Sequence, residues 1–265
     1  MPLVILMLLK KDIKEILASL KLKANDTLLI HSSLKSIGQI EDNAEGLLEA
    51  LMDYLSDGLL IFPTHTWDVM KQDDMVFDVN ETPSCVGALT NIARKTKGFI
   101  RSMHPTHSVC AYGKNAKWYV DHDLNATTPV GINNCFGILK DLNAKIMFIG
   151  APLSKNTFIH SIEEEFDVAE RFTDHIYHFI SKDNDKYVEF NMPKHYSKYN
   201  PHLSEHYEKL LPIFLQKGIA EEFMLGNAKS YLIDAKKSYE LVCDILNKDI
   251  HAFDSFKDIT HLVWI

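Results

Sequence analysis

The sequence predicts an α/β fold: a central mixed sheet that contains parallel strands and is flanked by helices, with an antiparallel elaboration near the C-terminus. Three observations predict it. First, apolar runs alternate with helical patterns over the first 165 residues. Second, these runs are continuously apolar, as in strands that are buried on both faces of a sheet. Third, the pattern changes after about residue 170. We expect residues 1–265 to form a single domain, since a chain of this length can bury a large core.

The elements of the first part follow from apolar spacing and from turn and capping signals. Apolar residues at helical intervals predict the first helix, and Asp42 and Glu45 have the spacing of a capping box at the start of the second. A polar loop is expected from Asp68 to Pro83. The expected strands lie at 27–30, 59–62, 109–113 and 145–150, and the expected helices at 12–22, 41–57, 84–94, 115–121, 137–142 and from about 156.

The C-terminal part has a different pattern. The polar stretch 182–185 separates two strand-like runs, which predicts a β-hairpin. The elements expected here are strands at 176–180, 186–192 and 230–233 and helices at 204–216 and 237–247.

Composition and charge exclude several classes. Hydrophobic residues make up 46% and charged residues 24%, which excludes a disordered chain or a coiled coil. The net charge of −8, from 28 basic and 36 acidic residues, disfavours a nucleic-acid partner because phosphate would be repelled. The apolar segment 1–9 is too short to span a membrane and precedes its lysines, the reverse of a signal peptide. Four cysteines without a Cys-x-x-Cys pair are typical of thiols in a reducing compartment. We expect a cytoplasmic protein without a membrane partner; a homodimer is left open.

Polar side chains follow the three clearest strands. His31 follows the first, His65 the second and His160 the third, and strand ends of this kind meet at the ligand-binding edge of an α/β sheet. Glu163 lies one helical turn after His160, so it can support the imidazole as a general base. The alternatives are a solvated acidic helix face, a Ser33 nucleophile without the Gly-x-Ser-x-Gly elbow, and a metal site without a known ligand spacing.

Two further clusters suit an anionic ligand. Ser32, Ser33 and the turn at Gly38 can offer backbone N–H groups to phosphate, with charge added by Lys35. The second cluster contains Arg101 and the polar side chains that follow it; its residues are Arg101, Ser102, His104 and Ser108. Each cluster alone is also compatible with ordinary loop chemistry.

Together these segments resemble the aminoglycoside 3-N-acetyltransferase family. They occur in the family's order and cover residues 12–165. The matching stretches are His31–Gly38, Phe62–Trp67, Arg101–Ser108, Pro129–Gly131, Ile149–Leu153 and Thr157–Glu163.

The resemblance implies acetyl-coenzyme A as cosubstrate and an amino sugar as acceptor of the acetyl group, which we expect to be transferred directly. No metal is expected, because no known ligand spacing is present. The resemblance also implies that His160 is the general base, that Glu163 supports it, and that His31 lies at the catalytic edge. The stretches implied to hold coenzyme A contain Ser32, Ser33, Leu34, Lys35, Gly38, Arg101, Ser102, Met103, His104 and Ser108.

The acceptor region departs from the family. Antibiotic-modifying members look acidic in their C-terminal halves, whereas the stretch 193–209 is basic and aromatic here. This favours a nucleotide-linked deoxyamino sugar for surface polysaccharides over an aminoglycoside antibiotic, which stays the alternative. A catalytically silent coenzyme A-binding or interaction protein is a further alternative. The residues expected to contact the acceptor are His65, Trp67, Glu164, Lys194, Tyr196 and Lys198.

Overall fold

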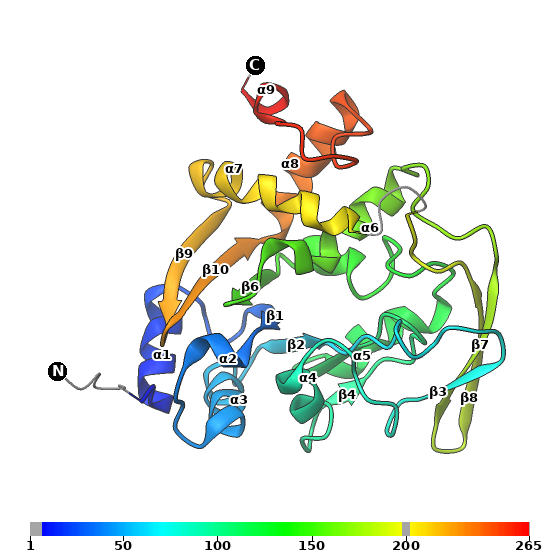
Figure 1. Ribbon diagram of the computed structural model, residues 1–265. Helices are drawn as coiled ribbons and strands as arrows, with labels where there is room; N and C mark the ends of the chain where they lie inside the picture. Colours follow the sequence, from blue (N-terminus) through cyan, green and yellow to red (C-terminus); the bar gives the residue numbers. More distant parts are fainter. Residues whose placement is uncertain (1–6, 198–201, 265) are drawn as a thin grey trace.

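The computed structural model describes residues 7–197 and 202–264 and contains a seven-stranded mixed sheet (Figure 1). β1 lies near the middle and pairs in parallel with β2 and β6, and the outer pairs are antiparallel. The predicted fold class is confirmed. In spatial order the strands are β4 (Ile100–Arg101), β5 (Val109–Gly113), β2 (Leu59–Pro63), β1 (Thr27–Ser32), β6 (Lys145–Ile149), β10 (Ala228–Asp234) and β9 (Ala220–Leu225).

Helices cover both faces of this sheet. Side chains alternate between faces along a strand, so Leu28 and Ile30 of β1 join one apolar cluster while Leu29 joins the other. The first face carries α1 (Lys10–Ser19), α2 (Leu34–Ile37), α3 (Asn43–Tyr54) and α4 (Ala88–Ala93). The second carries α5 (Ala116–Val120), α6 (Thr157–Glu165), α7 (Leu210–Gln216), α8 (Ala235–Lys248) and α9 (Thr260–Val263).

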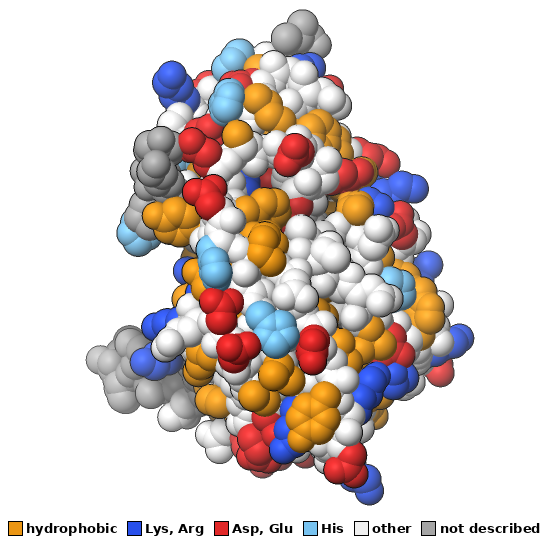
Figure 2. All heavy atoms as spheres, turned by 90° about the vertical axis from the view of Figure 1, so that its right-hand side faces the viewer, with side chains coloured by type: hydrophobic (Ala, Val, Ile, Leu, Met, Phe, Trp, Pro, Cys, Tyr) orange, Lys and Arg blue, Asp and Glu red, His pale blue; other side chains and the backbone are white. Residues whose placement is uncertain are grey.

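A three-stranded sheet stands beside the main sheet. The predicted hairpin is confirmed as β7 (Tyr177–Asp183) and β8 (Lys186–Met192), and β3 (Met75–Asp78) pairs in parallel with β7. On this side of the molecule, histidine and acidic side chains lie next to one another (Figure 2). His175 pairs with Asp73, for example, at 2.8 Å.

Several local predictions need correction. β3 lies inside the stretch expected to be a polar loop, and β9 was not predicted. The capping box at Asp42 does not form: that residue has a left-handed backbone, with φ 54°, and its carboxylate pairs with Lys10 at 2.6 Å. Predicted helices also contract or change type, giving 3₁₀ turns at Asp121–Asn125, Gly137–Lys140 and Leu203–Lys209, and a further 3₁₀ turn at Leu153–Lys155 was not predicted.

Two further expectations concern cysteines and membranes. The four cysteines are free thiols, of which Cys110 and Cys135 are buried while Cys85 and Cys243 are half-buried. Within the described residues, none of the helices is both long enough and apolar enough to cross a bilayer.

Candidate active site

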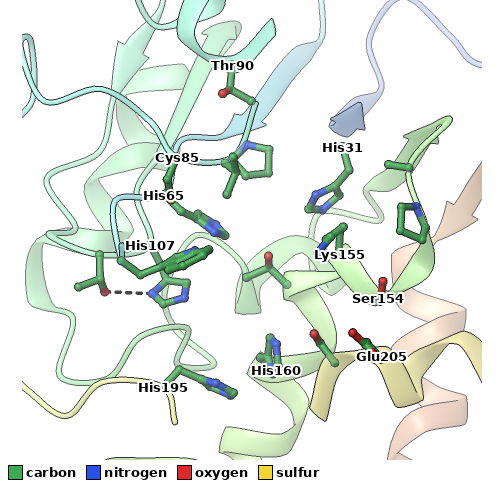
Figure 3. A pocket seen from close by; sticks show the side chains of 18 of the residues that line it. His31, His65, Cys85, Thr90, His107, Ser154, Lys155, His160, His195 and Glu205 are labelled. Carbon is green, nitrogen blue, oxygen red and sulfur yellow. Dashed lines mark hydrogen bonds between the residues drawn. The ribbon is translucent and has the colours of Figure 1, made fainter. Parts of the chain in front are cut away.

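A cavity of about 1100 Å³ opens at the edge of the main sheet where β1, β2 and β6 end (Figure 3). The structure brings His31, His65 and His160 together in its lining, although they are far apart in the sequence. His31 is the next-to-last residue of β1, His65 follows β2, and His160 lies in the first turn of α6 after β6.

Two further histidines line the same cavity. His107 stands two residues before β5, and because β5 runs antiparallel to β2, with Val109 opposite Pro63, this start lies beside the end of β2. The rings of His107 and His65 are 4.8 Å apart. His195 follows β8, and its ring lies 4.0 Å from that of His160. His195 belongs to the basic stretch 193–209 that was expected near the acceptor, whereas no role was predicted for His107.

The three histidines on the wall opposite α6 are neutral at neutral pH. Burial lowers the pKa of His31 to about 3 and holds the pKa values of His65 and His107 well below the ordinary range. For His65 and His107, repulsion from neighbouring imidazoles adds to the effect of burial on the pKa. The Nε2 atoms of His31 and His65 are buried and have no hydrogen-bond partner among the described residues. Two polar atoms at the cavity wall are thus left for a ligand.

His160 is held from behind by two side chains. Its Nδ1 lies 2.7 Å from the Tyr207 hydroxyl and 3.3 Å from Oε2 of Glu163, and the Tyr207 hydroxyl also donates to that carboxylate oxygen. Because the Tyr207 hydroxyl donates its hydrogen bond to Glu163, its oxygen can accept a hydrogen bond from Nδ1–H of His160. This assignment leaves the lone pair of His160 on Nε2, the nitrogen without a partner among the described residues.

Glu163 is fully buried but remains ionised. Burial opposes its charge, yet the hydrogen bond to His160, the positive charge of Arg171 and the Tyr207 hydroxyl lower its pKa to about 2. Nε of Arg171 donates to Oε1 at 3.0 Å, and its Nη2 donates to Asp254 at 2.6 Å. Tyr207, Arg171 and Asp254 could not be predicted as partners of this network, because they lie outside α6 in the sequence and reach it only through tertiary packing.

The Arg101 cluster is not in the cavity lining. The Nη atoms of Arg101 donate to the carbonyls of Thr64, Val79 and Thr82, at 2.6–3.2 Å, and its guanidinium stacks on Phe77. The neighbours of Arg101 also have partners inside the fold. Ser102 and His104 accept hydrogen bonds from backbone N–H groups, Ser108 donates to the Thr64 carbonyl, and Met103 packs in an apolar cluster. These donors are used inside the fold, and contact of this cluster with coenzyme A stays a prediction.

Only part of the first predicted anion-binding cluster lines the cavity. Ser32 and Ser33 line the cavity, whereas Leu34, Lys35 and Gly38 do not. Leu34 packs against the apolar cluster of the first face, and Lys35 is exposed. Gly38 ends α2 with φ 92°, and a Cβ there would lie 2.6 Å from the Asn227 side chain, so the turn itself requires glycine.

The residues expected to contact the acceptor are also divided. His65, Trp67, Lys194 and Tyr196 line the cavity, and Trp67 and Tyr196 are about half exposed, at 46% and 48%. Glu164 points elsewhere: its carboxylate accepts the Val130 N–H at 3.0 Å, and burial raises its pKa to about 7. Lys198 lies outside the described residues.

A comparison with protein families gives a match over most of the chain. A family model described as aminoglycoside 3-N-acetyltransferase matches residues 29–247. The chain belongs to this family.

Named relatives and a solved structure extend the comparison. The chain is 27% identical over 176 residues to the SPbeta prophage-derived aminoglycoside N(3')-acetyltransferase-like protein YokD of Bacillus subtilis (strain 168); the match covers 58% of this chain and 64% of YokD, less than two thirds of its length. It is 25% identical over 256 residues to aminoglycoside N(3)-acetyltransferase IX of Micromonospora chalcea, covering 85% and 89%. The structure titled "AAC-IIIb binary with CoASH" shares the fold, with TM-score 0.79 and 20% identity over 92% of this chain and 97% of that one.

Proposed function

We propose that this chain is an acetyl-coenzyme A-dependent N-acetyltransferase that acetylates an amino group of an amino sugar. One observation carries the proposal: His160 lies in the cavity with Nδ1 held by Tyr207 and Glu163, which leaves Nε2 as a base. A thioester is already activated, so no acyl-enzyme is needed. The alternative of a Ser33 nucleophile would need a base, and none of the hydrogen bonds found among the described residues joins its hydroxyl to an imidazole.

In the proposed reaction the acceptor amine attacks the thioester carbonyl, the C–N bond forms and the C–S bond breaks. His160 takes the proton that the amine loses and can return it to the leaving thiolate, so the base is regenerated. The ionised Glu163, held by Arg171, stabilises the positive charge that His160 carries between these steps.

Residues on the opposite wall fit the acetyl donor. Ser32 and Ser33 line the cavity at the end of β1, next to the unpartnered Nε2 of His31. A neutral imidazole N–H at this position can donate to the oxygen that becomes negative as the amine attacks. The relative named as bound to CoASH supports acetyl-coenzyme A as the cosubstrate.

Two acceptors remain candidates, and different observations support them. The names of the relatives support an aminoglycoside more directly than a nucleotide-linked sugar. The cavity of this chain supports the nucleotide-linked sugar: among its described lining residues Lys155 and Lys194 are basic and Glu205 is the single carboxylate. A polycation gains little from such a lining, whereas a diphosphate can pair with the lysines, and a base can stack on Trp67 or Tyr196.

Thiol release from acetyl-coenzyme A tests both levels of the proposal. Nucleotide-linked amino sugars and kanamycin-type aminoglycosides are tried side by side, and mass spectrometry checks for one added acetyl group. Thiol release that needs an amino sugar supports N-acetyl transfer; release with neither acceptor class contradicts it.

Salt and charge reversal separate the two acceptors. For a nucleotide-linked sugar, KM should rise from low to physiological salt and rise again in Lys194→Glu, because the attraction to phosphate is screened or lost. Lys229→Glu, on β10 and paired with Glu222 of the outer strand β9, is the matched control and should leave KM unchanged. Efficient acetylation of aminoglycosides with no turnover of nucleotide sugars would show that the aminoglycoside is the acceptor.

A further inference from the structure

Three side chains beside the cavity form a set of metal-type donors. His160, Glu163 and His195 each offer one ligand atom, and these atoms all lie within 4.8 Å of one another. Nδ1 of His160 is 3.3 Å from Oε2 of Glu163. Zinc bonds of about 2.0–2.1 Å at tetrahedral angles place neighbouring ligand atoms about 3.3–3.4 Å apart, so this pair already has the required separation.

The surroundings also suit a divalent cation. Two imidazoles and one carboxylate are a common protein donor set for zinc, and Nε2 of His195 is buried without a hydrogen-bond partner among the described residues. Glu163 is fully buried and is arranged to stabilise positive charge on His160, and an ion at Nδ1 would use the same interaction. Arg171 opposes the ion's charge, since it pairs with the other carboxylate oxygen at 2.9 Å.

We propose that Zn²⁺ binds to Nδ1 of His160, the carboxylate of Glu163 and an imidazole nitrogen of His195. The Tyr207 hydroxyl, which now contacts both His160 and Glu163, gives up these two hydrogen bonds and becomes available as a fourth ligand. The imidazole of His195 offers its ligand atom within 4.8 Å of the other two, and its chain neighbours Lys194 and Tyr196 are held by backbone hydrogen bonds to Thr173 and Arg171.

The consequence for catalysis follows from imidazole chemistry and rests on the proposed function. Nδ1 of His160 binds the metal with its lone pair, so the ring proton moves to Nε2. The nitrogen that faces the acceptor then has no lone pair, and His160 cannot take a proton. Zinc should therefore inhibit acetyl transfer reversibly without competing with acetyl-coenzyme A.

Zinc binding is measured first without any reaction. Tag-free, chelator-treated protein is titrated with Zn²⁺ against a chromophoric chelator, and with Co²⁺, whose visible absorption reports four-coordinate binding. We expect one ion per chain. His195→Ala should weaken zinc binding by at least about tenfold, because losing a metal ligand costs at least as much affinity as losing a residue that only hydrogen-bonds to a ligand. His107→Ala, which removes an imidazole of the same cavity outside the set, should bind zinc within twofold of the parent.

Each contrary result overturns the site. No zinc uptake by the parent protein, equal uptake by His195→Ala, or an equal loss in His107→Ala and His195→Ala would each contradict the assignment; thermal melts confirm that the variants are folded. Inhibition is a separate arm: zinc should lower acetyl transfer and a chelator should restore it. Because metal uptake is read on the protein alone, failure of the zinc site and failure of the proposed acetyl transfer are distinguishable.

Discussion

The segment that begins α6 and the segment around Arg101 carry similar side chains but use them differently. His160 has one nitrogen fixed by Tyr207 and Glu163, while the other is left toward the cavity. Arg101 gives its donors to backbone carbonyls and to the hydroxyls of Thr64 and Ser108. A functional polar side chain is therefore recognised by an atom that has no partner within the fold. Neither the residue type nor a position at a strand end is enough.

The comparison is tested most strongly by removing the imidazole of His160. In His160→Ala, kcat should fall by about 10²–10⁴ because no group takes the proton, whereas KM for acetyl-coenzyme A should stay nearly unchanged. Steady-state kinetics with the acceptor found above measure both constants. Activity within threefold of the parent would remove His160 from the mechanism.

Replacing Arg101 is expected to lower stability, with no change in the binding of acetyl-coenzyme A. Arg101→Ala leaves the carbonyls of Val79 and Thr82 without their donor, whereas the Thr64 carbonyl keeps the Ser108 hydroxyl. At about 1–3 kcal/mol for each lost donor, the free energy of unfolding should fall by at least about 2 kcal/mol. Urea unfolding measures this loss. At urea concentrations too low to unfold the variant, its KM for acetyl-coenzyme A should equal that of the parent. A rise in KM with normal stability would indicate that Arg101 contacts coenzyme A directly.

The sequence predicted the pair His160 and Glu163 because three-residue spacing on a helix makes side chains neighbours. It could not predict that Tyr207 lies between them, since this contact joins residues 47 positions apart and depends on how the Leu203–Lys209 turn packs on α6.

Two other misses have equally physical causes. His107 reaches the cavity because β5 is antiparallel to β2, and the direction of a short buried strand is not encoded in its apolar pattern. The burial of Arg101 depends on carbonyls at Val79 and Thr82, in a stretch that reads as a polar loop. Fold class follows from apolar periodicity, whereas the partners of individual polar atoms follow from tertiary packing.

Glu163→Gln separates orientation from charge within the α6 site. The amide can still contact His160, but it cannot stabilise its cation, so a charge-assisted hydrogen bond of about 1.5–3 kcal/mol is lost and kcat should fall about 10- to 150-fold. The loss should be smaller than that of His160→Ala, measured under the same conditions. A loss equal to that of His160→Ala would indicate that Glu163 itself takes part in proton transfer.

A paired carboxylate remote from the cavity provides the smallest effect and a control. Asp234 accepts the Lys237 N–H at the start of α8 and pairs with Lys145 at 2.7 Å, and these contacts outweigh burial to lower its pKa. Asp234→Ala should cost about 0.5–2 kcal/mol of stability and leave kcat unchanged.

The pH dependence of that cost has a definite sign. The folded-state pKa of Asp234 lies below its unfolded value near 3.8, so its contribution is present above that pH and is lost as the pH falls through the folded value. Thermal melts of parent and Asp234→Ala should therefore converge below about pH 4. A gap that widens on acidification would contradict the ion pair as its source.

Chemical rescue tests the central claim, that His160 supplies the base, most directly. Imidazole is added to folded His160→Ala with acetyl-coenzyme A and the acceptor, and acetylated product is measured by mass spectrometry. Product formation should rise with the concentration of neutral imidazole, while Arg101→Ala should gain nothing from the same addition beyond the uncatalysed background. Equal stimulation of both variants, or no stimulation of His160→Ala in a cavity that admits imidazole, would contradict the assignment of the base to His160.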